Sequence, residues 1–240
     1  MLIGFLATVS AASAATLAVS AAQADAPAVR DRADIERIVH DYILEHPEIL
    51  PQAMERLQAK RIAATIDEHR PEIETPYANA AWEGAKDADV VVVEFFDYAC
   101  SFCRASLPDL AKLLKSDPRV KIVYRELPIL SEQSGAAARV SLLAAEQGKY
   151  AAFHQAVYGA GQVTNASILS AAAKVGIDRA AAQAALTDKR YDSEIEKNLR
   201  LAQTLGATGT PSFVVGDRML SGAVGYDALK DAVEAARKKK

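Results

Sequence analysis

The spacing of hydrophobic positions predicts two helices near the N-terminus. Between residues 31 and 73, apolar side chains recur every three or four positions, as they do along one face of an α-helix. Pro47 favours an end of the first helix near His46, and either Pro47 or Pro51 suits the first turn of a second helix that continues toward Ile66. The two apolar stripes consist of Ile35, Ile38, Val39, Tyr42 and Ile43, and of Ile49, Leu50, Ala53, Met54 and Leu57.

A pair of short amphipathic helices cannot bury two apolar stripes on its own. The stripes therefore need a further partner, and the sequence leaves two interpretations open. The helices either pack on the rest of the chain or pair with the same helices of other copies and form a homo-oligomer. We favour the oligomer, because apolar stripes at helical spacing are typical of helix association.

A continuous apolar run at residues 90–96 marks a change of period. This run is rich in β-branched and aromatic residues, which is typical of a strand buried on both faces. A helix with Leu107, Leu110, Leu113 and Leu114 on its apolar side follows, and a second strand is expected at residues 120–124. Such a strand–helix–strand unit predicts parallel strands joined by a right-handed crossover.

The alanine-rich stretch between Leu127 and Ala207 is predicted to be helical throughout. Helices are expected at residues 131–147, 150–158, 166–175, 179–186 and 192–205. Asn165 and Asp178 are the expected N-caps, and the expected C-terminal stops are Gly148, Gly176 and Gly206. Strands are then expected at residues 212–215 and 219–220, joined by a turn at Gly216 and Asp217, before a last helix at residues 226–237.

Residues 1–24 are interpreted as a secretory signal peptide. They contain no charged residue and end in Ala22-Gln23-Ala24, the small residues that a cleavage site requires. A Lys or Arg before the apolar stretch is missing, so a retained N-terminal anchor or a misplaced start codon is the alternative. Nothing after Ala24 approaches the ~20 apolar residues that a membrane-spanning helix needs. We therefore expect export.

The composition of the 240-residue chain is that of an ordinary globular protein. Half of the residues are hydrophobic and a quarter are charged, which excludes a disordered tail protein or a collagen-like fibre. The 28 Lys and Arg against 31 Asp and Glu give a net charge of −3. Because nucleic-acid binders carry a basic excess on one face, no nucleic-acid partner is expected.

The two cysteines of the chain carry the candidate chemistry. Cys100 and Cys103 lie three positions apart, where the first predicted strand leads into a helix. The unpaired N–H groups and the positive dipole at a helix N-terminus stabilise a thiolate, which would make Cys100 the attacking nucleophile. Cys103, one turn further along, would resolve the mixed disulfide. The pair is therefore expected to cycle between dithiol and disulfide, with no other cofactor.

Two other interpretations of the cysteine pair are weaker. A structural zinc site needs four ligands, and the histidines of the chain show no ligand spacing relative to the pair. A purely structural disulfide over so short a loop would constrain the unfolded chain little. His154 stands beside Phe153 and before Val157 and Tyr158, so we interpret it as a hydrogen-bonded core histidine without a catalytic role.

Two motifs resemble those of a known family. Glu94-Phe95-Phe96-Asp97-Tyr98-Ala99-Cys100-Ser101-Phe102-Cys103 and, much later, Gly209-Thr210-Pro211-Ser212-Phe213 are similar to motifs of the DsbA-type thioredoxin-fold disulfide oxidoreductases. The helices around His46-Pro47-Glu48-Ile49-Leu50 resemble the oligomerising extension of ScsC-type members. The resemblance implies an α/β thioredoxin-like domain at residues 76–240, a helical insertion at about 128–207 and an N-terminal helical extension at 25–75.

The resemblance also implies roles for individual residues. Cys100 corresponds to the nucleophile and Cys103 to the resolving thiol. Pro211 falls where the family has a cis-proline, which would leave the Thr210 backbone free to pair with an extended client strand. Glu94 either accepts the proton of Cys103 or lies at a strand end and reaches water. Ser101 and Phe102 stand where strongly oxidising relatives have Pro and His, so a weaker oxidant is expected.

The sequence therefore predicts a periplasmic thiol–disulfide oxidoreductase that acts on unfolded or misfolded exported proteins and exchanges electrons with a membrane redox partner. A disulfide isomerase is favoured, and a monomeric DsbA-like oxidase is the first alternative. A metal-binding or chaperone module that uses the same cysteines is the second.

Overall fold

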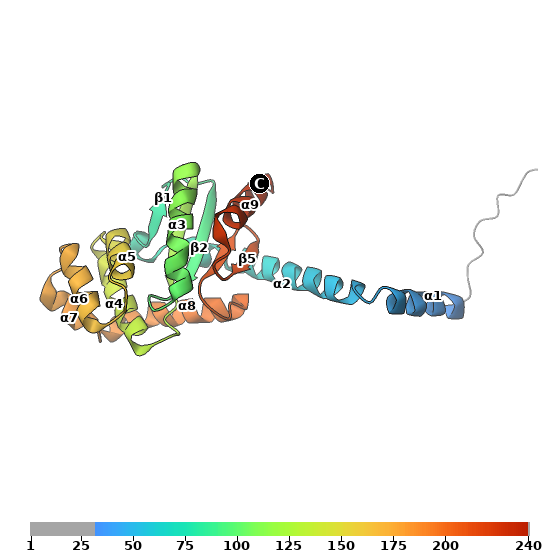
Figure 1. Cartoon of the computed structure of the whole chain (residues 1–240), viewed down its shortest axis with the longest axis horizontal. Coiled ribbons are helices and arrows are strands. Elements are labelled where there is room, and N and C mark those ends of the chain that lie inside the picture. The colour runs from blue at the N-terminus through green and yellow to red at the C-terminus, as the bar shows by residue number, and fades with distance from the viewer. Residues whose placement is uncertain (1–31, 240) are drawn as a thin grey trace, which may run out of the picture. The chain divides into compact units, whose positions relative to one another are not determined.

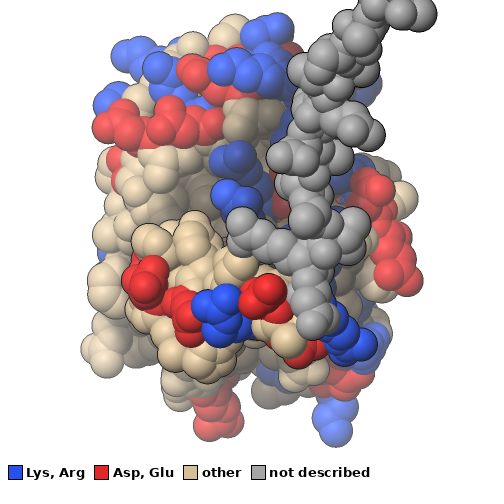
Figure 2. Space-filling view, turned by 90° about the vertical axis from the view of Figure 1, so that its right-hand side faces the viewer, with Lys and Arg blue, Asp and Glu red and all other residues tan. Residues whose placement is uncertain are grey.

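The computed structural model describes residues 32–239, and the predicted signal peptide lies outside the described residues. The described chain divides into two units, one that ends at Pro51 and one that begins at Gln52. Among residues 32–239, no helix combines the length and the apolar composition needed to cross a membrane. The surface in Figure 2 carries acidic and basic side chains near one another rather than a single sign of charge.

The two predicted N-terminal helices are present. Helix α1 covers Arg32–Glu45 and contains no buried residue, and α2 covers Ile49–Glu74 and buries only Ile66 and Ile73. Helix α2 extends past the predicted end near Ile66 and contains Pro71. The buried Arg125 explains this extension, because its guanidinium donates hydrogen bonds to the carbonyls of Glu72, Ile73 and Thr75 at the end of α2.

A five-stranded mixed sheet forms the centre of the second unit, with the order β1-β3-β2-β4-β5. Strands β2 (Val90–Phe96) and β3 (Val120–Glu126) are parallel, as predicted, and the other neighbours are antiparallel. The two C-terminal strands, β4 (Ser212–Val215) and β5 (Arg218–Ser221), form the predicted hairpin. The short edge strand β1 (Trp82–Gly84), which follows the 3-10 turn Tyr77–Asn79, was not predicted.

Strand β2 is buried on both faces, as expected. Val92 and Phe96 belong to a large core cluster with α3 (Ser101–Ser116) and α9 (Gly225–Lys238). Val93 and Phe95 belong to a second cluster with α2 and α8 (Asp192–Leu205). The C-terminal part of α2 is therefore part of the hydrophobic core of the second unit.

The helical insertion between β3 and β4 is confirmed. Its helices α4 (Glu132–Glu146), α5 (Tyr150–Gly159), α6 (Asn165–Lys174) and α7 (Arg179–Ala185) gather beside the sheet, and the short turn Lys189–Tyr191 leads into α8 (Figure 1). Asp178 caps α7 as predicted. The prediction of Asn165 as the N-cap of α6 is wrong, because Thr164 caps this helix in a reciprocal capping box with Ser167.

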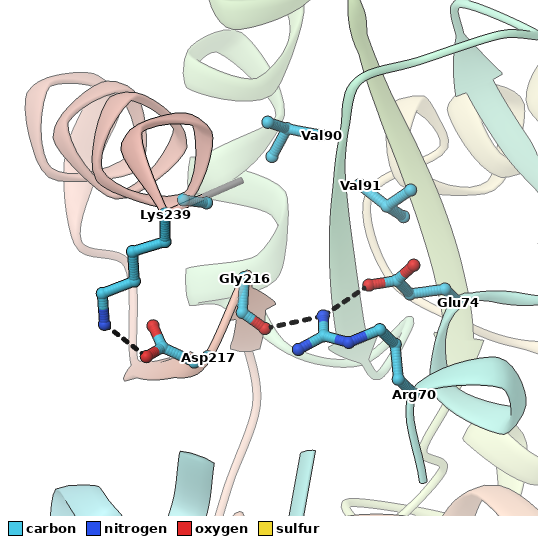
Figure 3. Close-up of a pocket in the computed structure, with 8 residues that line it drawn as sticks. Arg70, Glu74, Val90, Val91, Gly216, Asp217 and Lys239 are labelled. Carbon is cyan, nitrogen blue, oxygen red and sulfur yellow. Dashed lines mark hydrogen bonds and ion pairs between the residues drawn. The ribbon is translucent and has the colours of Figure 1, made fainter. Parts of the chain in front are cut away.

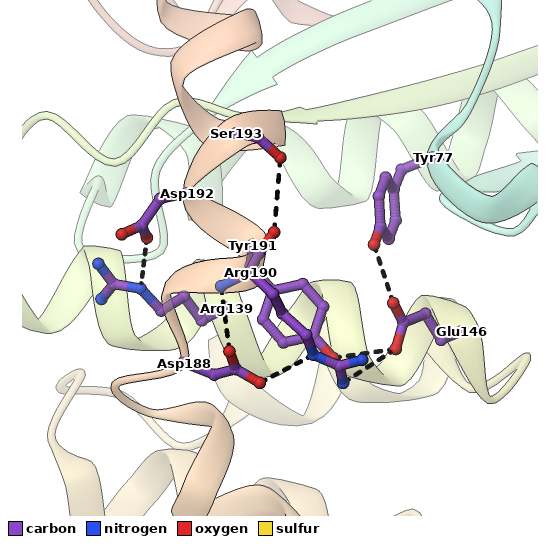
Figure 4. A network of polar contacts seen from close by, with 8 residues as sticks. All are labelled: Tyr77, Arg139, Glu146, Asp188, Arg190, Tyr191, Asp192 and Ser193. Atoms are coloured by element: carbon purple, nitrogen blue, oxygen red, sulfur yellow. Dashed lines mark hydrogen bonds and ion pairs between the residues drawn. The ribbon is translucent and has the colours of Figure 1, made fainter.

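Polar contacts join these elements at two places. In Figure 4, Glu146 on α4 accepts hydrogen bonds from the hydroxyls of Tyr77 and Tyr191, both at 2.9 Å. In Figure 3, Arg70 on α2 donates to Glu74 and to the carbonyl of Gly216 in the β4–β5 turn, at 3.0 and 3.1 Å, beside a cavity of about 260 Å³. These contacts tie the end of α2 and the helical insertion to the sheet domain.

Candidate active site

Cys100 caps the N-terminus of α3, as the sequence predicts. The residue has an extended backbone conformation, and its Sγ accepts a hydrogen bond from the backbone N–H of Cys103 at 3.2 Å. Both cysteines are free thiols, with 4% of Cys100 and 1% of Cys103 exposed. The fold thus buries both thiols, Cys100 at the N-cap and Cys103 in the first turn of the same helix.

The second motif lies directly against this thiol. The Thr210–Pro211 peptide bond is cis, as the family resemblance implies. The Cys100 thiol donates a hydrogen bond to the carbonyl oxygen of Thr210 at 3.2 Å, across 110 positions of sequence. The Thr210 hydroxyl is buried without a hydrogen-bond partner among the described residues. The structure therefore brings Cys100, Thr210 and Pro211 together in one site.

Cys103 is held in its protonated form by its surroundings. Burial raises the pKa of the Cys103 thiol well above its usual value, and the hydrogen bond with Cys100 and the nearby Glu94 carboxyl raise the pKa further. A buried thiol of this kind reacts only when a base nearby takes its proton.

Glu94 is buried in the middle of β2, so the alternative that it lies at a strand end and reaches water is wrong. Its exposed fraction is 1%, and its cross-strand partners are Tyr124 on β3 and Phe213 on β4. Burial, assisted by the negative charge of Glu83, raises the pKa of Glu94 to about 8. One carboxyl oxygen, Oε2, has no hydrogen-bond partner among the described residues.

Asp97, three residues before Cys100, is a site residue that sequence reasoning missed. Its carboxylate is 1% exposed and accepts hydrogen bonds from the backbone N–H groups of Ala99, Ile129 and Leu130, at 2.7 to 2.9 Å, and from the Ser134 hydroxyl at 2.6 Å. The hydrogen bond from the Ala99 N–H to the Asp97 carboxylate closes a local turn, which Asp favours because its side chain can bind the backbone two residues further along. The other contacts attach the loop after β3 to the active-site turn.

Three exposed apolar side chains lie in the segments that form and contact the active-site turn. Phe102 is 64% exposed, and Ile129 and Leu130, whose backbone binds Asp97, are 45% and 54% exposed. In the described chain after Leu57, these are the large apolar side chains that remain exposed. These three exposed side chains, Phe102 in the first turn of α3 and Ile129 and Leu130 in the loop bound by Asp97, are here called the apolar rim.

His154 is the core histidine that the sequence predicts. It is fully buried, its Nδ1 lies 3.2 Å from the Tyr98 hydroxyl, and its ring packs against Phe96 and Tyr124. Burial lowers its pKa to about 3, so it stays neutral. Within residues 32–239, no three His, Cys, Asp or Glu side chains are grouped so that they could hold a metal ion.

Family models match both parts of the chain. The DSBA-like thioredoxin domain model matches residues 91–234, and the model of the N-terminal domain of the copper resistance protein ScsC matches residues 31–64.

Solved structures show the same fold. A thioredoxin-like oxidoreductase from Silicibacter pomeroyi is 44% identical, with 65% of this chain and 91% of that chain covered and a TM-score of 0.63. A linker-deletion variant of Proteus mirabilis ScsC is 30% identical, with 89% of this chain and 100% of that chain covered and a TM-score of 0.69.

Curated relatives include longer proteins. The match to the Na(+)/H(+) antiporter NhaA 3 of Salinispora tropica is 30% identical over 64% of this chain, and the chain spans about a quarter (24%) of that antiporter's length. Disulfide bond formation protein D of Bacillus subtilis is 23% identical, with 65% of this chain and 77% of that protein covered. With its family-model matches and its Cys100-Ser101-Phe102-Cys103 site, the chain belongs to the DsbA-like family of thioredoxin-fold thiol–disulfide oxidoreductases and has a ScsC-type N-terminal domain.

Proposed function

We propose that this protein is a periplasmic enzyme that exchanges disulfides with exported client proteins through Cys100 and Cys103. The observation that carries the proposal is the position of the Cys100 thiol, at the start of α3 and against the carbonyl of Thr210, with the buried Cys103 behind it. A family member with a periplasmic description, a thioredoxin-like protein of Salmonella enterica, supports the location.

The exchange begins when the Cys100 thiolate attacks one sulfur of a client disulfide. A Cys100–client disulfide forms, and the second client sulfur leaves as a thiolate that takes a proton from water. In isomerisation, a client thiolate attacks the client sulfur of this mixed disulfide, closes a different client disulfide and restores Cys100. In reduction, Cys103 attacks Cys100, so that the Cys100–Cys103 disulfide forms and the client gains two electrons.

Glu94 is proposed to accept the proton of Cys103 in the reductive step. The attack requires the Cys103 thiolate, which burial strongly disfavours. A buried carboxyl whose pKa lies at about 8 is a suitable base near neutral pH, because its proton affinity is close to that of the solution. When Cys103 is reduced again, the same carboxyl returns the proton.

Clients are proposed to bind as extended segments with apolar residues beside their cysteine. The backbone of Thr210 lies next to the reacting thiol and offers a place for strand pairing. The apolar rim of Phe102, Ile129 and Leu130 offers contacts to the neighbouring client side chains. Unfolded and misfolded proteins expose such segments, whereas folded proteins bury them.

We further propose that the N-terminal helices assemble the protein into a homo-oligomer that favours isomerisation. Their exposed large apolar side chains are Ile35, Ile38, Val39, Tyr42, Leu44, Leu50, Met54 and Leu57. Copies joined through these side chains would present several active sites to one client, and a membrane reductase would keep Cys100 reduced. A monomer would instead favour a DsbA-like oxidase, regenerated by a membrane oxidase.

The oligomer is tested by light scattering of the mature chain and of the variant Ile38→Lys/Leu57→Lys. We expect a dimer or trimer for the parent and a monomer for the variant, which should lose refolding of scrambled ribonuclease but keep insulin reduction. Leu130→Lys, a matched change at an exposed apolar residue of the rim, should leave the mass unchanged. A monomeric parent would contradict the isomerase and support the oxidase.

A metal-binding or chaperone module is the second candidate, favoured by two neighbouring thiols, since Cu(I) prefers such soft ligands. The double variant Cys100→Ser/Cys103→Ser separates the functions. If the parent never reduces insulin and the variant still prevents client aggregation to the same extent, the chaperone function replaces the enzyme.

A further inference from the structure

Arg104, in the first turn of α3, differs from the other arginines of the described chain. Those that are not exposed, Arg70, Arg125, Arg139 and Arg237, each form an ion pair with a carboxylate. Arg104 is half-buried as well, yet among residues 32–239 no carboxylate oxygen lies within 4.0 Å of its guanidinium. Taking a charge out of water is costly unless it is paired, so Arg104 lacks the partner that its burial calls for.

The guanidinium of Arg104 is held in place but keeps free donors. One Nη atom donates a hydrogen bond to the carbonyl of Gly161, in the loop between α5 and α6. The Nε atom is buried and has no hydrogen-bond partner among the described residues. A guanidinium carries five N–H donors in a planar fork that fits the two oxygens of a carboxylate. The contact with Gly161 therefore fixes the fork without neutralising its charge.

A cavity of about 490 Å³ lies beside Arg104 at the active-site turn. Its lining includes Ala99, the residue before the nucleophile, together with Ser131 and Gln162. Among the described residues that line this cavity, Arg104 carries the one charged side chain. The amide of Gln162 can add further hydrogen bonds to an anion. The cavity is therefore suited to a negatively charged group.

Client residues close to the reacting cysteine can reach this cavity. Ala99 lines it and is bonded to Cys100, and consecutive Cα atoms lie about 3.8 Å apart. In an extended client segment, a residue two positions from the cysteine lies ~7 Å along the chain. Ser131, on the wall of the cavity, follows Leu130 of the apolar rim. The cavity thus borders the surface on which clients are proposed to bind.

We propose that Arg104 and this cavity bind a carboxylate side chain of the client, so that the enzyme favours clients with Asp or Glu near the reacting cysteine. The inference rests on the proposed exchange through Cys100 and names a substrate class within it. The net charge of −3 gives the chain as a whole no attraction for acidic segments. The selectivity therefore depends on the local charge of Arg104.

The test compares peptide disulfides that differ in one charge. Each substrate is a dimer of one peptide joined through its single cysteine, with Glu, Gln or Lys two positions before the cysteine in one series and two positions after it in another. Quenched-flow chromatography gives the rate constant for reduction by the reduced full chain. In at least one series, the parent should reduce the Glu peptide roughly fivefold faster than the Gln peptide and the Lys peptide most slowly.

Arg104→Gln should bring the ratio of the Glu and Gln rates to about one, and Arg104→Glu should make the Lys peptide the fastest. A change in folding or in the reactivity of Cys100 alters the rates of all peptides alike, so the ratio reports on the carboxylate site. Arg179→Gln, the same change at an exposed arginine in the first turn of α7, is the control and should keep the ratio of the parent.

The outcomes separate the site from the proposed function. If the parent reduces all peptides at one rate, or if Arg104→Gln keeps the ratio of the parent, the carboxylate site is overturned while disulfide exchange stands. Arg104 then only ties α3 to the loop between α5 and α6. If the parent reduces none of the peptides, the proposed function fails and the site fails with it.

Discussion

Two regions of the molecule depart from the usual distribution of side chains in opposite ways. The N-terminal region, residues 32–57, exposes its large apolar side chains, and α1 contains no buried residue. The catalytic region, residues 62–239, buries ionisable side chains that proteins usually expose, with Glu94, Asp97, Arg125, Glu126 and His154 each at most 2% exposed. The first departure indicates a missing partner, and the second indicates either a satisfied structural network or a chemical role.

Hydrogen bonding distinguishes a buried ionisable group with a structural role from one with a chemical role. Asp97 accepts four hydrogen bonds, and Arg125 binds Glu194, Asn198 and the end of α2. Glu94, in contrast, has a carboxyl oxygen without a partner among the described residues. A satisfied buried charge positions the chain around it, whereas an unsatisfied one is poised to change its protonation.

The largest expected effect on stability is that of Arg125→Met. The change leaves the Glu194 carboxylate, the Asn198 side chain and the carbonyls of α2 without their donor, so the free energy of unfolding should fall by about 3 kcal/mol or more. Urea unfolding of the reduced protein measures this. Arg200→Met, at a largely exposed position of α8, should change it by no more than about 0.5 kcal/mol. Equal effects of the two changes would contradict the structural role of Arg125.

Glu94→Gln should stabilise the protein progressively as the pH rises above 4.5, because it removes a proton that the folded protein holds and the unfolded chain releases. Since the folded state raises the pKa of Glu94 from 4.5 to about 8, the folded protein holds this proton more tightly than the unfolded chain. The contribution of Glu94 to stability is full below pH 4.5 and is lost as the pH rises to about 8. At pH 8 the variant should exceed the parent by about 2–4 kcal/mol in unfolding free energy.

Unfolding of the reduced parent and of Glu94→Gln from pH 4 to pH 8 checks whether the difference in their unfolding free energies grows as the pH rises. Glu196→Gln, at an exposed carboxyl of α8, is the control and should follow the parent at every pH. A constant difference between parent and Glu94→Gln from pH 4 to pH 8 would show that the pKa of Glu94 is not raised by folding.

Substitutions in the apolar rim are expected to weaken client binding moderately. Ile129→Ser/Leu130→Ser should raise the KM for a disulfide peptide with apolar flanks about tenfold, since the lost burial is worth ~1.4 kcal/mol. The rate with glutathione disulfide should stay within a factor of about two, because a tenfold change would require ~1.4 kcal/mol of lost contact. Leu44→Ser, at an exposed position of α1, should change neither value. An equal loss of activity with both substrates would show that Ile129 and Leu130 act on the disulfide exchange itself rather than on client binding.

The smallest expected effect is that of Leu50→Gln/Met54→Gln on the stability of the isolated chain. Both side chains are more than half exposed, so unfolding in dilute solution should change by no more than about 0.5 kcal/mol. At high protein concentration the parent should melt at a rising temperature and the variant at a constant one. A large destabilisation in dilute solution would mean that the chain itself covers these residues.

Local patterns predicted much of the fold and the central pair of the site. The apolar run of β2 and the cysteines at the start of α3 are features of neighbouring residues, so they are readable in the sequence. Strand β1 has only three residues and offers no alternating pattern, so it was missed. Thr164 and Asn165 are both good N-caps, and only the contact with Ser167 decides between them.

The remaining features depend on contacts between distant segments. Asp97 binds Ile129 and Leu130 more than 30 positions away, and Arg125 binds the end of α2 about 50 positions earlier. Whether Glu94 is buried depends on what covers β2, which composition alone does not determine. Sequence reasoning therefore found the reacting thiols but not the groups that hold the loops around them or set the protonation of Glu94.

The most direct test of the account is to trap the mixed disulfide with Cys103→Ser. Without the resolving thiol, the attack of Cys100 on scrambled ribonuclease should leave a stable client adduct that mass spectrometry locates on Cys100, and Cys100→Ser should form none. An adduct of equal yield on Cys103 in Cys100→Ser, or undiminished insulin reduction by that variant, would contradict the assignment of Cys100 as the nucleophile.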